Sequence, residues 1–226
     1  FAGPYTVTHH KATLLIASHF SFFNAGSGTN QSNHMYKLGP YHHGFMERGC
    51  KTGSNSYILW PSRIGAFSTV IGAHYDNIDS SNFPFSYITE HGYHQTRLIP
   101  ALNLFGVGLA RDENKWIERD RRTGDKKDLI IFEVFSPYTV SKMINAEKIL
   151  KDIRKNKDEN NKKGDFIVYK NMIIKGASLN KYSQRYSIAI DLYLRNKLLS
   201  YIKDCKNIND IIESLKSEKV YSDWVD

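Results

Sequence analysis

Short apolar runs separated by small and polar residues make up the first part of the chain. Strand-like runs occupy residues 5–8, 13–16, 20–23 and 56–60, and no apolar stripe with helical spacing crosses them. Between the last two runs, residues 24–55 are rich in Gly, Ser, Asn and Thr. A polar segment of this length is either a tightly wound β structure with a functional face or an unusually long loop.

An aliphatic–glycine–small unit then occurs twice, as Ile64-Gly65-Ala66 and as Ile71-Gly72-Ala73. Hexapeptide repeats of this kind are typical of parallel β-helices, in which the aliphatic residue points inward and the small residues let the backbone turn. Asn side chains of the polar segment can pair between neighbouring coils of such a fold. The pattern therefore predicts a mainly β fold built as a parallel β-helix, with an irregular β-sandwich as the alternative.

The period of the apolar positions changes at Pro137. Thr139 is predicted to cap a helix whose apolar residues recur at helical spacing as far as Ile153. Residues 165–174 predict a small β-hairpin, and a second helix is predicted to start at Ser178.

Three smaller segments complete the predicted organisation. Residues 103–110 are apolar and contain glycine, which predicts a further coil; residues 129–135 predict a strand, and residues 208–215 a short third helix. We therefore expect two domains. Residues 1–136 form a β-helix-like domain with loop insertions, and residues 137–226 form a helical appendage with a small hairpin.

Composition indicates a globular protein. Of the 226 residues, 41% are hydrophobic and 24% charged, and no apolar run approaches the roughly 20 residues of a membrane span. We therefore predict no membrane association and a cytoplasmic protein, with Cys50 and Cys205 as free thiols in a reducing compartment. The chain begins at Phe1 without an initiator methionine, which indicates a processed form or a fragment.

The net charge of +8 comes largely from the carboxyl-terminal part. Lysines there alternate with acidic residues and with apolar helical positions, which is typical of a solvated helical surface. This pattern favours a helical surface over a nucleic-acid partner.

Several short motifs are spread over about residues 5–200. They are Asn24-Ala25-Gly26, Tyr36-Lys37-Leu38-Gly39-Pro40, Glu47-Arg48-Gly49-Cys50-Lys51-Thr52, Ser56-Tyr57-Ile58-Leu59-Trp60-Pro61, Pro84-Phe85-Ser86-Tyr87 and Arg119-Asp120-Arg121-Arg122. Together they resemble an uncharacterised bacterial family, a domain of unknown function. The resemblance implies a left-handed parallel β-helix similar to that of hexapeptide-repeat transferases, and a homo-oligomer. Because the chain has two clear hexapeptides with long insertions, it does not imply their acetyl-CoA mechanism, and the cofactor is left open.

Two histidines are candidates for a general base. His34 is surrounded by Asn30 and Asn33, which suit the hydroxyls of a sugar, and His74 directly follows the second repeat unit. A neutral histidine beside an acceptor hydroxyl can take its proton, which is the role of the catalytic histidine in hexapeptide acyltransferases. The alternative is that these histidines bond neighbouring coils.

Basic and aromatic residues are candidates for binding a phosphate-bearing ligand, because arginine forks bind phosphate bidentately and aromatic rings stack on a base or sugar. The substrate-binding candidates are Asn30, Asn33, Lys37, His42, Arg48, Lys51, Trp60, Arg111, Lys115, Arg119 and Arg121. For residues 111–122 the alternative is an exposed charged helix. No histidine or cysteine pair has convincing metal-ligand spacing, so no metal site is predicted.

These observations predict a transferase-like enzyme that acts on a sugar-phosphate or a nucleotide-sugar. The alternative is a non-catalytic β-helical scaffold or carbohydrate-binding subunit.

Overall fold

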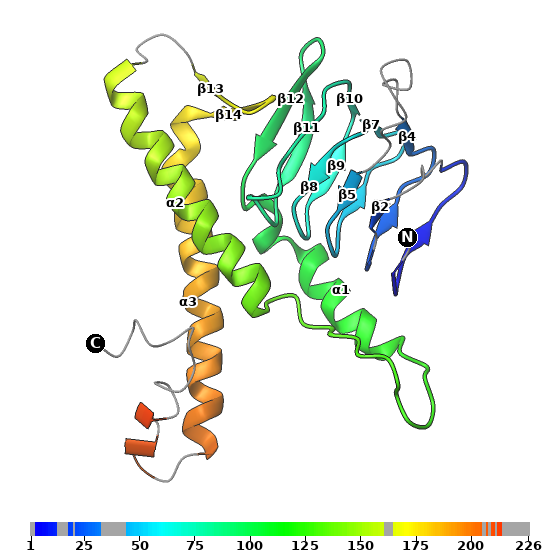
Figure 1. Ribbon diagram of the computed structural model, residues 1–226, viewed down its shortest axis with the longest axis vertical. Coiled ribbons are helices and arrows are strands. Elements are labelled where there is room, and N and C mark those ends of the chain that lie inside the picture. The colour runs from blue at the N-terminus through cyan, green and yellow to red at the C-terminus, as the bar shows by residue number, and fades with distance from the viewer. Residues whose placement is uncertain are drawn as a thin grey trace.

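The computed structural model describes residues 3–12, 18–19, 21–32, 44–160, 165–204, 207, 209–210 and 212–213. The chain winds into a mainly β fold, a β-solenoid of about four turns, and long helices lie beside it (Figure 1). This confirms a wound β structure for the described part of the glycine- and asparagine-rich segment.

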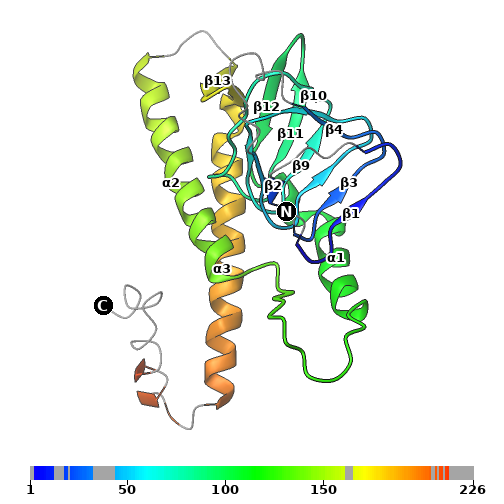
Figure 2. The same cartoon turned by 45° about the vertical axis from the view of Figure 1, so that its right-hand side comes forward.

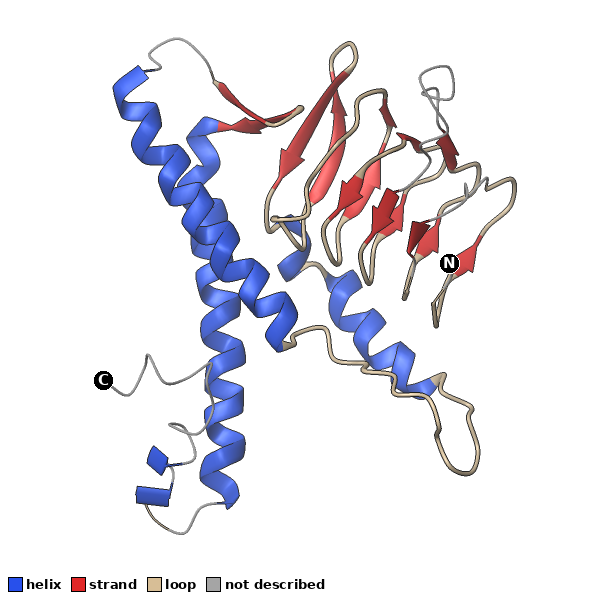
Figure 3. Cartoon of the chain, viewed as in Figure 1, coloured by secondary structure: helices blue, strands red, loops and turns tan. Residues whose placement is uncertain are grey.

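Three sheets form the sides of the solenoid (Figure 3). The long sheet contains, in spatial order, β1 (Val7–Thr8), β3 (Asn24–Ala25), β6 (Lys51–Thr52), β9 (Thr69–Ile71), β11 (Tyr87–His91), β12 (Gln95–Ile99), β14 (Met172–Lys175) and β13 (Phe166–Tyr169). The second sheet contains β10 (Ala73–His74), β7 (Tyr57–Leu59) and β4 (Asn30–Ser32), and the third contains β2 (Ser18–His19), β5 (Gly44–Met46) and β8 (Arg63–Ile64). Pairing between coils is parallel, while β11–β12 and β13–β14 are antiparallel hairpins.

Register along the long sheet separates an inner from an outer column of side chains. Lys51 pairs with Thr69, and Thr69 with Tyr87, so successive coils are 18 residues apart here. Because side chains alternate across a strand, the next residues face inward. These are Thr52, Val70, Ile88 and Leu98, all of them buried.

The two aliphatic–glycine–small units do not occupy equivalent positions. Ile64 lies in β8 of the third sheet and is fully buried, whereas Ile71 ends β9 of the long sheet and is 42% exposed. Alternation along β9 points Val70 inward and Ile71 outward. Only in the first unit does the aliphatic residue point inward, as the repeat pattern predicts.

Helices follow the solenoid. They are η2 (Leu102–Phe105), α1 (Val107–Glu118), α2 (Pro137–Asn160), η3 (Gly176–Ser178) and α3 (Leu179–Asp204). Figure 2 shows α2 packed along α3, and α1 beneath the first strands of the long sheet. The prediction of a coil over residues 103–110 was wrong, because this segment forms η2 and the start of α1. The Asn103 side chain there donates to the Phe67 carbonyl, at 2.7 Å, and so ties η2 to the solenoid.

Residues 129–135 do not form the predicted strand. Their backbone groups find side-chain partners in place of a ladder: Arg48 donates to the Ile131 carbonyl, and the Val134 N–H donates to the Glu113 carboxylate at 3.3 Å. The β11–β12 hairpin, by contrast, was not predicted. Its turn contains Gly92, with a φ of +58°.

Helix α2 begins at Pro137, where the apolar period changes. Ser136 and Thr139 form a reciprocal cap, in which the Thr139 N–H donates to Ser136 Oγ at 3.4 Å and the Ser136 N–H donates to Thr139 Oγ1 at 2.9 Å. Ser136 is therefore the capping residue, and Thr139 lies inside the first turn.

The predicted hairpin near residues 165–174 is confirmed as β13–β14. Much of the predicted third helix lies outside the described residues.

A half-buried carboxylate attaches α2 to the solenoid. Glu47 accepts hydrogen bonds from the Tyr138 hydroxyl at 3.0 Å and from the Ala66 N–H at 3.2 Å, and Lys142 lies 3.8 Å away. Burial raises the pKa of Glu47 more than these partners lower it.

Within the described part of the chain, no helix is long and apolar enough to cross a bilayer.

Candidate functional site

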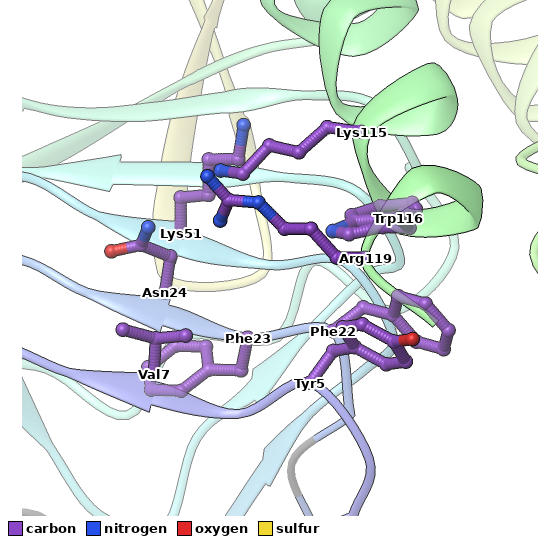
Figure 4. A pocket seen from close by; sticks show the side chains of 9 residues that line it. All are labelled: Tyr5, Val7, Phe22, Phe23, Asn24, Lys51, Lys115, Trp116 and Arg119. Atoms are coloured by element: carbon purple, nitrogen blue, oxygen red, sulfur yellow. The ribbon is translucent and has the colours of Figure 1, made fainter. Parts of the chain in front are cut away.

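A cleft of about 50 Å³ lies between the outer face of the long sheet and α1 (Figure 4). It is lined by Tyr5, Val7, Phe22, Phe23, Asn24, Lys51, Lys115, Trp116 and Arg119. The cleft brings together three residues that the sequence proposes for anion binding.

The floor of the cleft is one column of outward-facing side chains. Val7 pairs with Asn24, and Asn24 pairs with Lys51, so the three residues stand on adjacent strands. Neighbouring strands are about 4.8 Å apart, which sets the spacing of these side chains. The floor therefore runs from an apolar group through an amide to an ammonium group.

Helix α1 supplies the opposite wall. Lys115 and Arg119 are four residues apart and so share a face of the helix end, with Trp116 beside them. The Trp116 ring packs against Phe22, with 4.6 Å between ring centroids, and is only 7% exposed. This packing fixes the distance between the long sheet and the part of α1 that bears Lys115 and Arg119.

The charged ends of Lys51, Lys115 and Arg119 point toward one another (Figure 4). None of the nine lining residues is acidic, so the cleft favours an anion. The carboxyl-terminal end of α1 opposes this with the equivalent of only about half a negative charge, which three full positive charges outweigh. Tyr5, Phe22 and Trp116 add aromatic side walls to the cleft.

Two acidic side chains near α1, Asp120 and Glu113, have partners outside the cleft. Asp120 binds Arg122 at 2.9 Å and Lys126 at 3.1 Å, and hydrogen bonds from these residues lower its pKa. The Glu113 carboxylate accepts a hydrogen bond from the Val134 N–H. Neither carboxylate lines the cleft.

His74, a candidate general base, lies inside the solenoid and is 1% exposed. Its Nε2 lies 3.2 Å from the Ile71 carbonyl and its Nδ1 2.8 Å from Thr96 Oγ1, so the neutral ring donates to the first and accepts from the second. Burial lowers the pKa of His74 to about 4, although Ile71 and Glu90 act in the opposite direction. This environment favours the alternative in which the histidine bonds neighbouring elements.

We expect His74 to make stability depend on pH. Below its usual pKa of 6.5 the unfolded chain binds a proton that the native ring takes up only near pH 4, so stability falls as pH falls through this window. The loss is about 2 kcal/mol between about pH 7 and pH 5, at 1.36 kcal/mol per pKa unit. Urea unfolding at both pH values measures it, with His74→Gln as the control for the other histidines. Equal losses in the two proteins would contradict the assignment.

Other predicted residues lie away from the cleft. Trp60 is fully buried, so its ring offers no face to a ligand. Asn30 is exposed on β4 of the second sheet, in register with Tyr57. Arg121 is exposed beyond the end of α1 and does not line the cleft.

Arg48 holds a loop. Its guanidinium donates to the Ile131 carbonyl, and its Cζ lies 4.6 Å from the Phe22 ring centroid and 5.7 Å from that of Phe67. Burial lowers the pKa of Arg48, and the charge of Glu133 partly opposes this. The side chain does not line the cleft.

Several predictions fall outside the described residues. They concern His34, Asn33, Lys37, His42 and Cys205, together with the side chain of Arg111. Cys50 is a free, buried thiol, and burial raises its pKa. Among the residues that the structure describes, no group of three or more His, Cys, Asp or Glu side chains is arranged to hold a metal.

Sequence reasoning missed two of the three floor residues of the cleft, Val7 and Asn24. Asn24 pairs with Lys51 although it lies 27 residues before it in the sequence. An 18-residue spacing would have indicated a different partner. Tyr5, Phe22 and Phe23 are recognisable as apolar positions, but nothing in the sequence places them against α1.

One protein-family model matches residues 1–154 and is described as a domain of unknown function (DUF4954). The chain belongs to this family. Neither a curated protein nor a solved structure matched the chain. The DUF4954 match contains the solenoid, α1 and most of α2, and hence the whole cleft. It ends before β13, β14 and α3. The resemblance to a family of unknown function is thereby confirmed, while its bacterial origin stays a prediction.

Proposed function

We propose that the cleft binds the phosphate group of a sugar-phosphate or nucleotide-sugar, and that the chain acts as a binding module. The observation that carries the proposal is the convergence of Lys51, Lys115 and Arg119 in a cleft with no acidic lining residue. A guanidinium fork and two ammonium groups match the geometry and charge of a phosphate.

The size of the cleft supports a phosphate group rather than a whole ligand. A volume of about 50 Å³ holds a small anion. The sugar would lie outside, over the outer column of the long sheet. The Asn24 amide on the floor can both donate to and accept from a sugar hydroxyl.

Binding is favoured over group transfer at this cleft. A transferase would need a general base within hydrogen-bond reach of the acceptor. None of the nine lining residues is His, Asp or Glu. A transferase reaction that uses His34, which is the reaction that the sequence predicts, is our second proposal, and unchanged turnover after replacement of His34 would exclude that base.

We also propose that the solenoid belongs to the left-handed hexapeptide-repeat class. A spacing of 18 residues between Lys51, Thr69 and Tyr87 equals three hexapeptides per coil, which supports the left-handed hexapeptide class. We also propose a homo-oligomer, which the same resemblance implies, and a cytoplasmic location, which the composition and the two cysteines favour.

Crystals soaked in glucose 6-phosphate test the proposed site. We expect the phosphate within hydrogen-bond distance of at least two of Lys51, Lys115 and Arg119, because these are the donors that line the cleft. Glucose alone is the matched control and should leave the cleft empty. A phosphate bound only at another basic surface, or no bound phosphate, would contradict the proposal.

A further inference from the structure

A second and larger cavity, of about 230 Å³, lies on the third sheet of the solenoid. Its lining includes Phe45, Pro61, Ser62, Arg63, Asn77 and Asp79. None of these residues lines the cleft on the long sheet, so the two cavities are separate.

One outward column of side chains forms the base of this cavity. Phe45 of β5 pairs with Arg63 of β8, and Arg63 pairs in turn with Asp79. The Phe45 ring is 38% exposed, and the Arg63 guanidinium carbon lies 5.6 Å from its centroid. An apolar ring, a donor group and a carboxylate thus follow one another on adjacent coils.

The β13–β14 turn fixes the polar end of the cavity. Lys170 Nζ lies 2.5 Å from Asp79 Oδ2, and Asn171 Nδ2 donates to the Asn77 carbonyl at 3.0 Å. Ser81 donates to Asp79 Oδ1 through its N–H at 3.1 Å and its hydroxyl at 2.6 Å. Burial raises the pKa of Asp79, but the bonds from Lys170 and Ser81 outweigh it and the net pKa is lowered. The carboxylate is therefore charged and oriented at neutral pH.

These groups differ in chemistry from those of the cleft on the long sheet. Asp79 would repel an anion, whereas the combination of guanidinium, amide and carboxylate supplies both donors and acceptors. Phe45 adds an apolar surface on which a ring can lie. The volume is smaller than the roughly 300 Å³ at which pockets for drug-sized ligands begin, which suits a single ring.

We propose that this cavity binds a neutral monosaccharide ring. The C–H face of the sugar packs on Phe45, while its hydroxyls donate to Asp79 and accept from Arg63. The site lies on a different face from the phosphate cleft, so it does not depend on the function proposed for that cleft.

Saturation-transfer difference NMR with methyl glucopyranoside, methyl galactopyranoside and methyl mannopyranoside, each at millimolar concentration, tests this inference. We expect at least one glycoside to receive saturation from the wild-type protein. The signal should be lost in Phe45→Ala and in Arg63→Ala, and kept in Tyr93→Ala, which removes a ring that is 88% exposed on the β11–β12 turn. Two independent variants, each checked for a native circular dichroism spectrum, guard against a variant that fails to fold.

Three results would overturn the proposal. They are no saturation of any glycoside by the wild-type protein, a signal that survives both Phe45→Ala and Arg63→Ala, and a signal that disappears in Tyr93→Ala instead. The last result would move the sugar to the β11–β12 turn, where His94 and Tyr75 pack edge to face with 4.5 Å between centroids.

Discussion

Replacing Trp60 with alanine is expected to lower the free energy of unfolding by about 3–5 kcal/mol, the usual cost of removing a large buried aromatic side chain. The Trp60 ring has no exposed surface. It packs directly on the backbone of Gly44, where an added Cβ would lie 2.2 Å from Trp60 Cε3. Because ladder hydrogen bonds hold the neighbouring coils in register, the solenoid cannot collapse into the cavity that alanine leaves.

Urea unfolding followed by far-ultraviolet circular dichroism measures this loss. Trp60→Phe retains much of the ring and should cost less than Trp60→Ala. Tyr93→Ala, at an exposed position, should stay within about 0.5 kcal/mol of the wild type. A loss below about 1 kcal/mol in Trp60→Ala would contradict the packing around Trp60.

The sequence predicted the wound β structure and the start of α2 because both leave periodic signals. Strands alternate with period two, and the change to helical spacing occurs at Pro137, where α2 begins. Alternation alone does not show which of the two sets of side chains faces the core, because that depends on the register between the coils. That is why Trp60 was predicted to stack on a ligand although it fills the core, and why Ile71 was expected to point inward.

Three of the candidate residues that the sequence indicates line the cleft. Lys51, Lys115 and Arg119 were candidates on charge alone, and the structure brings them together. Arg48 is only three residues from Lys51, yet it lies before the corner at Gly49, where φ is +75° and the chain turns from the third sheet onto the long sheet. Sequence proximity across such a corner does not place two side chains in one site.

Reversing one charge of the cleft is expected to weaken binding of glucose 6-phosphate by about 100-fold or more. In Arg119→Glu, a cation that lines the cleft becomes an anion. Each unit charge about 4 Å from the phosphate contributes up to about 4 kcal/mol near a protein surface. Solvent reduces this at the exposed Arg119, and a 100-fold loss corresponds to about 2.7 kcal/mol.

Arg121→Glu is the matched control. It changes the net charge of the chain by the same amount as Arg119→Glu does. Arg121 lies two residues after Arg119, at an exposed position that does not line the cleft. Any general loss of electrostatic attraction would appear equally in both variants.

Titration of the wild type, Arg119→Glu and Arg121→Glu with glucose 6-phosphate at low salt tests the phosphate cleft most directly. The indole N–H of Trp116, which lines the cleft, is the reporter in ¹H–¹⁵N spectra. The account predicts a saturable shift of this signal in the wild type and in Arg121→Glu, and almost none in Arg119→Glu. Equal weakening in both variants, or a wild-type signal that glucose 6-phosphate does not move, would contradict it.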